Sequence, residues 1–276
     1  MTNATKRGDV YFLSHGGPPM IEQYHAPPYH GWKKFGKLLL GNKPKGIVVV
    51  SAHWENSSGS GVVVNNNPSN PLLYDFYNFP AHFYKLQFKS RHEPEFRSKV
   101  IETLKKGDIP VSEQNRGIDH GIFIPFIAAL GESIDIPLLQ VSLPASSDPH
   151  ESVKLGKALS GLRDEGYSVI ATGQVVHNLR DLFSGTPSTY TKPFLNAVTT
   201  AVNSPDPVTE TLKLVSHPLY KRAHPTDEHF FPIYVSLGAI APEDKIEEIY
   251  VGIVDVQGKT VDNNGLGWGM WRWSSN

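Results

Sequence analysis

The stretch from Lys45 to Trp54 constrains the fold of this chain more than any other. It reads Lys-Gly-Ile-Val-Val-Val-Ser-Ala-His-Trp, with an uninterrupted, mostly β-branched apolar run between a glycine and a serine. Such a run is typical of a strand buried on both faces of a sheet. His53 follows it, and open α/β sheets bind their ligands just past the carboxyl ends of their strands. Taken alone, His53 is still better explained as a hydrogen-bonded core histidine.

Strand-like and helix-like stretches alternate along the rest of the chain, which predicts an α/β fold. Besides the stretch above, apolar or alternating runs predict strands at residues 10–13, 60–64, 85–88, 137–143, 167–172, 246–254 and 268–273. Periodic apolar positions predict helices at residues 32–40, 93–106, 122–130, 148–165 and within 192–214. A chain of 276 residues can form one such domain or two small ones, and no linker requires two.

Charge and hydropathy point to a small-molecule partner. The chain has 26 basic and 27 acidic residues, a formal net charge of -1, and no run of like charges. This balance argues against a nucleic-acid or anionic membrane partner. The longest apolar stretches are shorter than a membrane span, and the polar start lacks the apolar segment of a signal peptide. We therefore expect a soluble cytoplasmic protein, whose oligomeric state the sequence does not determine.

The chain has no cysteine but 12 histidines. The absence of cysteine excludes disulfides, thiolate nucleophiles, and zinc or iron–sulfur sites with cysteine ligands. Any metal must therefore be held by nitrogen and oxygen. Histidine without thiolate suits zinc, iron, copper or nickel, and argues against magnesium or calcium, which prefer oxygen.

Three of these histidines share one local pattern. His15, His53 and His177 each follow a predicted buried strand through a short turn that contains Gly or Ser. If the strands are parallel, the three side chains lie at the same edge of the sheet, where a metal site can form. The sequence therefore predicts a histidine-rich divalent metal site at the carboxyl-terminal strand edge.

A fourth histidine is expected to arrive from the start of a helix. Thr226 can cap a helix that continues through Leu237, with Glu228 and His229 in its first turn. Side chains of adjacent helical residues point about 100° apart, so we expect only one of this pair to face the metal.

Two further segments are candidates for contact with a substrate. His120 precedes the apolar run 122–130, and the positive end of a helix dipole favours a neutral imidazole there. Such an imidazole suits hydrogen bonding to an anionic oxygen or to dioxygen. The aromatic loop 74–80, with Phe76 and Phe79, could form a wall of an aromatic-substrate pocket, although core packing explains it equally well.

Taken together, these motifs resemble one known family. They are Phe-Leu-Ser-His15-Gly-Gly-Pro-Pro-Met, Val-Val-Val-Ser-Ala-His53-Trp, Asp75-Phe-Tyr-Asn-Phe-Pro80, Gly-Ile-Asp119-His120-Gly, Thr-Gly-Gln-Val-Val-His177-Asn-Leu and Pro225-Thr-Asp-Glu-His229-Phe-Phe-Pro232. In this order, over nearly the whole chain, they are similar to the DOPA-type branch of the class III extradiol ring-cleaving dioxygenases, the LigB-like superfamily.

The resemblance implies a fold and an activity. The fold is a single α/β catalytic domain over residues 1–276, with a central, mostly parallel or mixed sheet flanked by helices. The activity is insertion of both atoms of dioxygen next to the diol of a catechol, a DOPA-like substrate, at a mononuclear non-haem Fe(II) site. Zn(II) is expected as an alternative occupant in purified protein.

The resemblance also implies residue roles. His15, His53 and His229 resemble the metal ligands, and His177 resembles an acid/base that can also close on a zinc ion. His120 resembles the histidine that assists binding of dioxygen or the substrate anion, while Phe76 and Phe79 would stack on the substrate ring.

Three alternatives remain open at the level of sequence. Other class III branches use a glutamate as third ligand, so Glu228 competes with His229, although Thr-Asp-Glu-His-Phe-Phe-Pro favours His229. The same histidines could serve a zinc hydrolase of a small amide or ester with Glu228 as base. The chain could also bind a metal or a catechol without turnover, since a fold does not guarantee activity.

Overall fold

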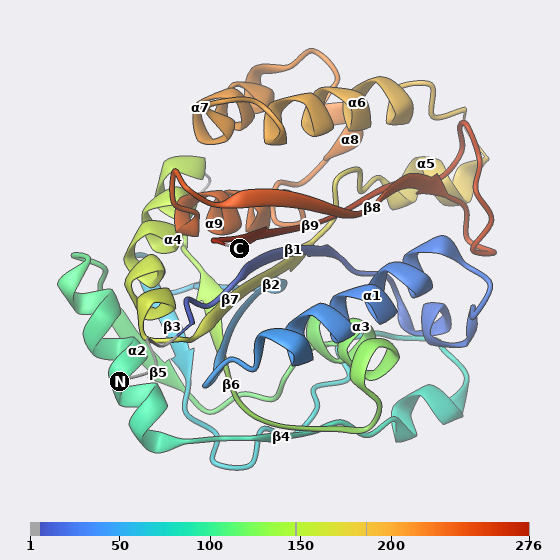
Figure 1. Ribbon diagram of the computed structural model, residues 1–276. Coiled ribbons are helices and arrows are strands. Elements are labelled where there is room, and N and C mark those ends of the chain that lie inside the picture. Colours follow the sequence, from blue (N-terminus) through green and yellow to red (C-terminus); the bar gives the residue numbers. More distant parts are fainter. Residues whose placement is uncertain (1–5, 147, 186, 276) are drawn as a thin grey trace.

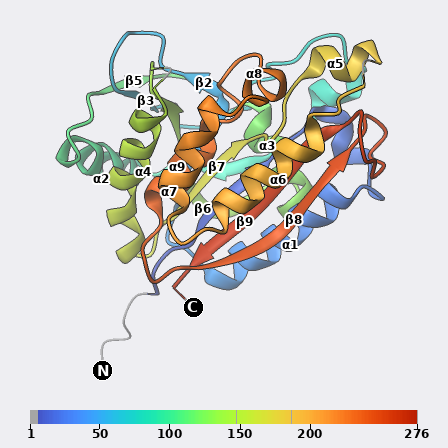
Figure 2. The ribbon, with the colours of Figure 1, turned by 90° about the horizontal axis from the view of Figure 1, so that it is seen from above.

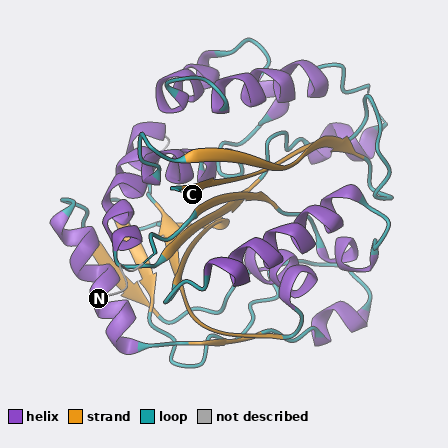
Figure 3. Ribbon diagram, in the orientation of Figure 1, coloured by secondary structure: helices purple, strands orange, loops and turns teal. Residues whose placement is uncertain are grey.

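The computed structural model describes residues 6–146, 148–185 and 187–275, and its centre is one mixed sheet (Figures 1 and 3). The strands are β1 (Val10–Ser14), β2 (Ile47–Glu55), β3 (Val62–Asn65), β4 (Lys89–Arg91), β5 (Val111–Gln114), β6 (Ser133–Leu143), β7 (Ser168–Gly173), β8 (Lys245–Val254) and β9 (Leu266–Ser274). They follow the order β5-β3-β6-β2-β7-β1-β9-β8, with β4 paired to β6. The predicted single α/β domain with a mixed sheet is confirmed.

The strands at the centre of the sheet are parallel. β2 pairs in parallel with both β6 and β7, and β7 pairs in parallel with β1. Antiparallel pairing begins beyond β1, where β9 and then β8 complete one side of the sheet. The carboxyl ends of β2, β7 and β1 therefore meet at one edge, as the histidine pattern predicts.

Helices cover both faces of the sheet. They are α1 (Pro27–Asn42), α2 (Pro94–Lys106), α3 (His120–Leu130), α4 (Pro149–Asp164), α5 (Leu179–Ser184), α6 (Thr191–Val202), α7 (Pro207–Leu212), α8 (Tyr220–Ala223) and α9 (Pro232–Ala239), with 3-10 turns η1 (Pro18–Glu22), η2 (Ala81–Lys85) and η3 (Lys213–Ser216). One face carries α1 and α3; the other carries α4 and α9, with α7 next to α9 and α6 over β8 and β9 (Figures 1 and 2).

The alternation of side chains along the strands divides the core into two layers. In β1, Tyr11 and Leu13 pack toward α1 and α3, while Val10 and Phe12 pack toward α4 and α9. All five residues of β1 are buried, as expected for a strand covered on both sides. This double burial fixes the position and direction of the strand end that precedes His15.

Two local predictions are wrong. Residues 85–88 alternate like a strand, but Lys85 ends η2, and β4 begins only at Lys89. The alternation places Phe88 in the core without providing a neighbouring strand to pair with. The helix predicted from Thr226 begins instead at Pro232, because proline lacks an N–H group and suits the first helical position.

Among the described residues, every helix is too short or too polar to span a bilayer.

Candidate metal centre

The three strand-associated histidines do meet at the predicted edge. His15 directly follows β1, and His177 lies four residues past the end of β7. His53 does not follow β2 as expected but lies inside it, in a stretch where the pairing is irregular: the ladder to β7 ends at Ser51, and the ladder to β6 shifts before Glu55. This irregularity lets the His53 side chain turn toward His15.

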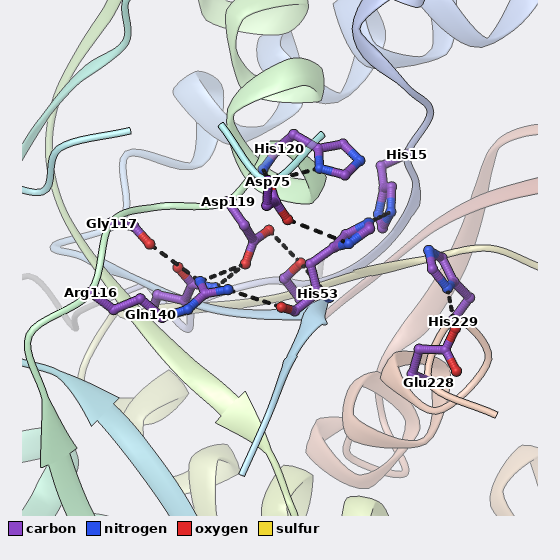
Figure 4. A network of polar contacts seen from close by, with 11 residues as sticks. His15, His53, Asp75, Arg116, Gly117, Asp119, His120, Gln140, Glu228 and His229 are labelled. Carbon is purple, nitrogen blue, oxygen red and sulfur yellow. Dashed lines mark hydrogen bonds and ion pairs between the residues drawn. The ribbon is translucent and has the colours of Figure 1, made fainter. Parts of the chain in front are cut away.

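Imidazoles from distant parts of the chain lie in contact here (Figure 4). The Nε2 atoms of His15 and His53 are 2.9 Å apart. The ring centroid of His229 lies 5.4 Å from that of His15 and 4.9 Å from that of His53. His177 stacks on His229 with centroids 3.5 Å apart and an interplanar angle of 9°.

The geometry of His15 and His53 fits a shared metal ion. Histidine nitrogens bind zinc at about 2.0–2.1 Å, so two of them on one ion can lie no more than about 4.2 Å apart. The separation of 2.9 Å between the His15 and His53 nitrogens meets that limit. Burial, followed by the neighbouring His53, holds the pKa of His15 well below 6.5, and burial lowers the pKa of His53 to about 4. Both rings are therefore neutral near pH 7, the form that binds metals.

The candidate ligand atoms fall into two adjoining groups among the described residues. One contains His15, His53 and His120, and the other contains His177, Glu228 and His229; within each group the atoms lie within 4.8 Å of one another. The rings of His53 and His229, with centroids 4.9 Å apart, place the two groups side by side in one cluster of imidazoles. His120 therefore lies closer to His15 and His53 than the sequence indicates, with a centroid separation of 4.0 Å from His53.

Backbone contacts hold His229 beside the end of β7. Its carbonyl oxygen accepts a hydrogen bond of 2.7 Å from the Gln174 N–H. A Cβ atom at Gly173 would lie 2.3 Å from the same oxygen, so this approach requires glycine. Nδ1 of His229 lies 2.9 Å from Oε1 of Glu228, an outer partner of the kind that orients metal-binding histidines. Glu228 and His229 thus occupy a turn before α9 and interact with each other.

Burial, followed by the neighbouring His224, lowers the pKa of His177 to about 3, although Glu228 acts in the opposite direction. The ring is thus neutral near pH 7 and able to accept a proton.

Asp75 is a site residue that the sequence did not single out. Its Oδ1 lies 2.8 Å from Nδ1 of His120 and accepts a hydrogen bond of 3.0 Å from the His120 backbone N–H. Its Oδ2 lies 3.5 Å from Nδ1 of His53. Burial raises the pKa of Asp75, but its contacts with His120 and His53 outweigh burial, so the pKa lies below the ordinary value. In the sequence, the only sign of this role is that Asp75 is the one carboxylate in the aromatic loop 74–80.

A second buried carboxylate holds the irregular end of β2. Asp119 accepts hydrogen bonds from Ser51 Oγ at 2.7 Å, from Arg116 at 3.0 Å, and from Gln140. Arg116 also donates to the His53 carbonyl oxygen at 2.9 Å (Figure 4). The network ties the strand segment that carries His53 to the start of α3. Its sequence signal was the carboxylate directly before His120.

Close packing at Gly121 brings α3 against the cluster. A Cβ atom there would lie 2.6 Å from Ser51 Oγ, 2.9 Å from His53 Cδ2 and 3.0 Å from His15 Cε1. Only glycine lets the first turn of the helix approach both imidazoles.

The aromatic loop lies beside His120. Phe76 is 6 % exposed, and its ring stands perpendicular to that of His120 with centroids 5.8 Å apart. Phe79 contacts Phe76 at 5.6 Å and is partly exposed. The loop thus forms a wall next to the cluster, with Phe79 the more accessible of the two rings.

The fold and the cluster define an α/β protein with a histidine-rich candidate metal site at the carboxyl edge of parallel strands. Comparison with known proteins identifies the family: residues 9–256 match the profile described as the catalytic LigB subunit of aromatic ring-opening dioxygenase. The chain belongs to this family of extradiol, aromatic ring-cleaving oxidoreductases.

Several relatives support this assignment. A "4,5-DOPA dioxygenase extradiol-like protein" of Schizosaccharomyces pombe is 34% identical, over 86% of this chain and 76% of its own length. A "4,5-DOPA dioxygenase extradiol" of Beta vulgaris is 31% identical, over 88% of this chain and 90% of its own. The crystal structure of an uncharacterized protein from Escherichia coli K12 matches 96% of this chain and 99% of its own, with a TM-score of 0.71 and 27% identity.

Proposed function

We propose that this protein is a metal-dependent extradiol dioxygenase that opens the aromatic ring of a catechol, a DOPA-like diol, with dioxygen. The observation that carries the proposal is the contact of neutral imidazoles from three distant segments, with 2.9 Å between the His15 and His53 nitrogens. The names of the curated relatives support the substrate class. In this proposal His15, His53 and His229 hold the metal, for which we propose Fe(II), with Zn(II) as the alternative occupant.

A ferrous ion held by these histidines would supply Lewis-acid and redox chemistry for the reaction of the diol with dioxygen. His177 acts as the base: its neutral ring accepts a phenolic proton as the diol binds, and can return it later. The negative charge of the bound diol raises the basicity that burial has lowered.

His120 faces the anionic oxygen through Nε2. Its Nδ1 lies against Asp75, so Nε2 is the ring atom left to contact dioxygen or the substrate anion, and it donates to an anionic oxygen when it also carries a proton. The partly exposed Phe79, supported by Phe76, forms the apolar wall for the substrate ring. In this proposal Glu228 orients His229 and does not act as a base. Its Oε1 lies within hydrogen-bonding distance of His229 Nδ1 and Thr226 Oγ1.

The test is anaerobic reconstitution with Fe(II), followed by a panel of catechols that includes DOPA, in an oxygen electrode. We expect oxygen uptake that depends on the catechol, together with a new yellow absorbance from the ring-opened product. Matched 1,3-diols and monophenols should consume no oxygen, because they cannot place two adjacent oxygens on one ion. Replacing His177 by Ala should lower kcat by about 100- to 10,000-fold, the usual contribution of a general base.

Two outcomes would contradict the proposal. Hydrolysis of amides or esters by the zinc-loaded protein, without oxygen uptake by the iron-loaded protein, would support a hydrolase. Tight binding of metal and catechol with neither reaction would support a binding protein.

A further inference from the structure

Asp75 contacts two of the clustered imidazoles through different oxygen atoms (Figure 4). Oδ1 binds both the Nδ1 and the backbone N–H of His120, at 2.8 Å and 3.0 Å. Oδ2 faces Nδ1 of His53 at 3.5 Å. The Asp75 side chain is 19% exposed, so it is largely shielded from water that could replace it.

A carboxylate in this position determines which ring nitrogens carry protons. An ionised carboxylate only accepts hydrogen bonds, so Nδ1 of His120 must donate to it, and the negative charge of Oδ2 favours a proton on the Nδ1 of His53 that faces it. In the neutral ring of His53, Nε2 is then free of a proton and can bind a metal. For His53 this is the nitrogen that lies 2.9 Å from Nε2 of His15.

A purely structural role explains only part of these contacts. The bond from Oδ1 to the His120 N–H satisfies a backbone donor at the start of α3, where Asp119, the residue before the helix, makes no such side-chain bond. The contact of Oδ2 with His53 adds nothing to that capping. It joins the side chain of β2 to that of α3 through one rigid group.

We propose that Asp75 is a positioning residue whose carboxylate fixes the tautomers and orientations of His53 and His120 together. It thereby links a metal ligand to the residue that faces dioxygen or the substrate anion. This inference rests on the metal site of the proposed function. It assigns no contact between Asp75 and the metal or the substrate.

The test measures Co(II) binding to the full-length protein carrying Asp75→Asn. The amide keeps an oxygen for His120 but turns its NH₂ donor toward Nδ1 of His53, which favours the wrong tautomer. We expect the Co(II) affinity to fall about 10- to 100-fold, as for other outer partners of metal-binding histidines. The visible absorption bands of the remaining Co(II) complex should change in position and intensity.

The chain offers a matched control. Asp148 also accepts a backbone N–H bond at a helix start, from His150 at 2.9 Å, but touches none of the clustered imidazoles. Asp148→Asn removes the same charge at a helix start and should leave Co(II) affinity and spectrum unchanged. Asp75→Glu, which keeps a carboxylate, should bind Co(II) more tightly than Asp75→Asn.

The outcomes separate this inference from the proposed function. If the wild-type protein binds no Co(II) at the histidines, the proposed metal site falls and this inference with it. If the wild type binds Co(II) and Asp75→Asn matches its affinity and spectrum, only the inference is overturned. Equal losses in Asp75→Asn and Asp75→Glu, with a lowered thermal unfolding temperature of the metal-free proteins, would also overturn it, because they indicate a structural role.

Discussion

His224 shows how burial controls a single imidazole next to the cluster. It is fully buried, and its Nε2 lies 2.7 Å from the Val175 carbonyl oxygen. Its ring packs against Phe230 with centroids 4.9 Å apart. Burial lowers the pKa of His224 from 6.5 to about 4, while the bond to Val175 acts in the opposite direction. His224 lies outside the pattern of a strand followed by a histidine, so that pattern does not single it out.

The stability of the fold should therefore depend on the charge of His224. Because its folded pKa of about 4 lies below the unfolded value of 6.5, its contribution is complete above pH 6.5 and is lost as the pH falls toward 4. His224→Gln keeps a donor for Val175 and removes the titrating group. Its free energy of unfolding should fall less steeply than that of the wild type, by on the order of 3 kcal/mol across this window.

Urea unfolding at a series of pH values measures this difference. His150→Gln, at an exposed histidine, is the control and should follow the wild type. If the free energy of unfolding depends on pH equally in His224→Gln and in the wild type, His224 does not have the lowered pKa given above.

At the scale of elements, the end of β2 depends on one buried carboxylate. Asp119 is fully buried and accepts hydrogen bonds from the side chains of Ser51, Gln140 and Arg116. The Arg116 side chain is only 13% exposed. These side-chain hydrogen bonds hold β2 where its backbone pairing with β6 is interrupted, between Val50 and Glu55. The segment carrying His53 is thus held by side chains where the backbone pairing is broken.

Replacing Asp119 by Asn should destabilise the protein by about 3–5 kcal/mol, because it leaves the Arg116 charge buried without its partner. It should also weaken metal binding, since His53 loses its support. Urea unfolding and metal titration measure the two effects. Asp262→Asn, which breaks the exposed pair with Lys192, should leave the free energy of unfolding close to that of the wild type. A similar loss in both variants would contradict this role of Asp119.

The same elements show what sequence can and cannot predict. β1, β7 and the first half of β2 were predicted because both of their faces are buried, which leaves an apolar run of strand length. The second half of β2 was missed because its polar Ser51 is bonded to Asp119, a residue 68 positions away. α9 begins at Pro232 and not at Thr226, because a threonine is a frequent helix cap but does not by itself start a helix. Local patterns report burial, whereas long-range polar bonds leave no periodic signal.

At the scale of the whole molecule, strand order brings the site together. The order β2-β7-β1 places the carboxyl ends that lead to His53, His177 and His15 side by side. The sequence predicted this convergence on the assumption of parallel strands, and the structure confirms the parallel pairing. The sequence did not indicate that α3 would place His120 against His53, or that Asp75 would connect them, because these contacts depend on how loops cross the sheet edge.

The most direct test of the account is the crystal structure of the metal-loaded protein, with the ion located by its anomalous scattering. We predict one strong peak within about 2.0–2.2 Å of Nε2 of His15, Nε2 of His53 and a ring nitrogen of His229, at the usual bonding distance. In that structure Glu228 would remain on His229 and His120 would remain on Asp75, neither reaching the ion. A peak coordinated by Glu228 or His120 in place of His229, or a peak away from His15 and His53, would contradict the account.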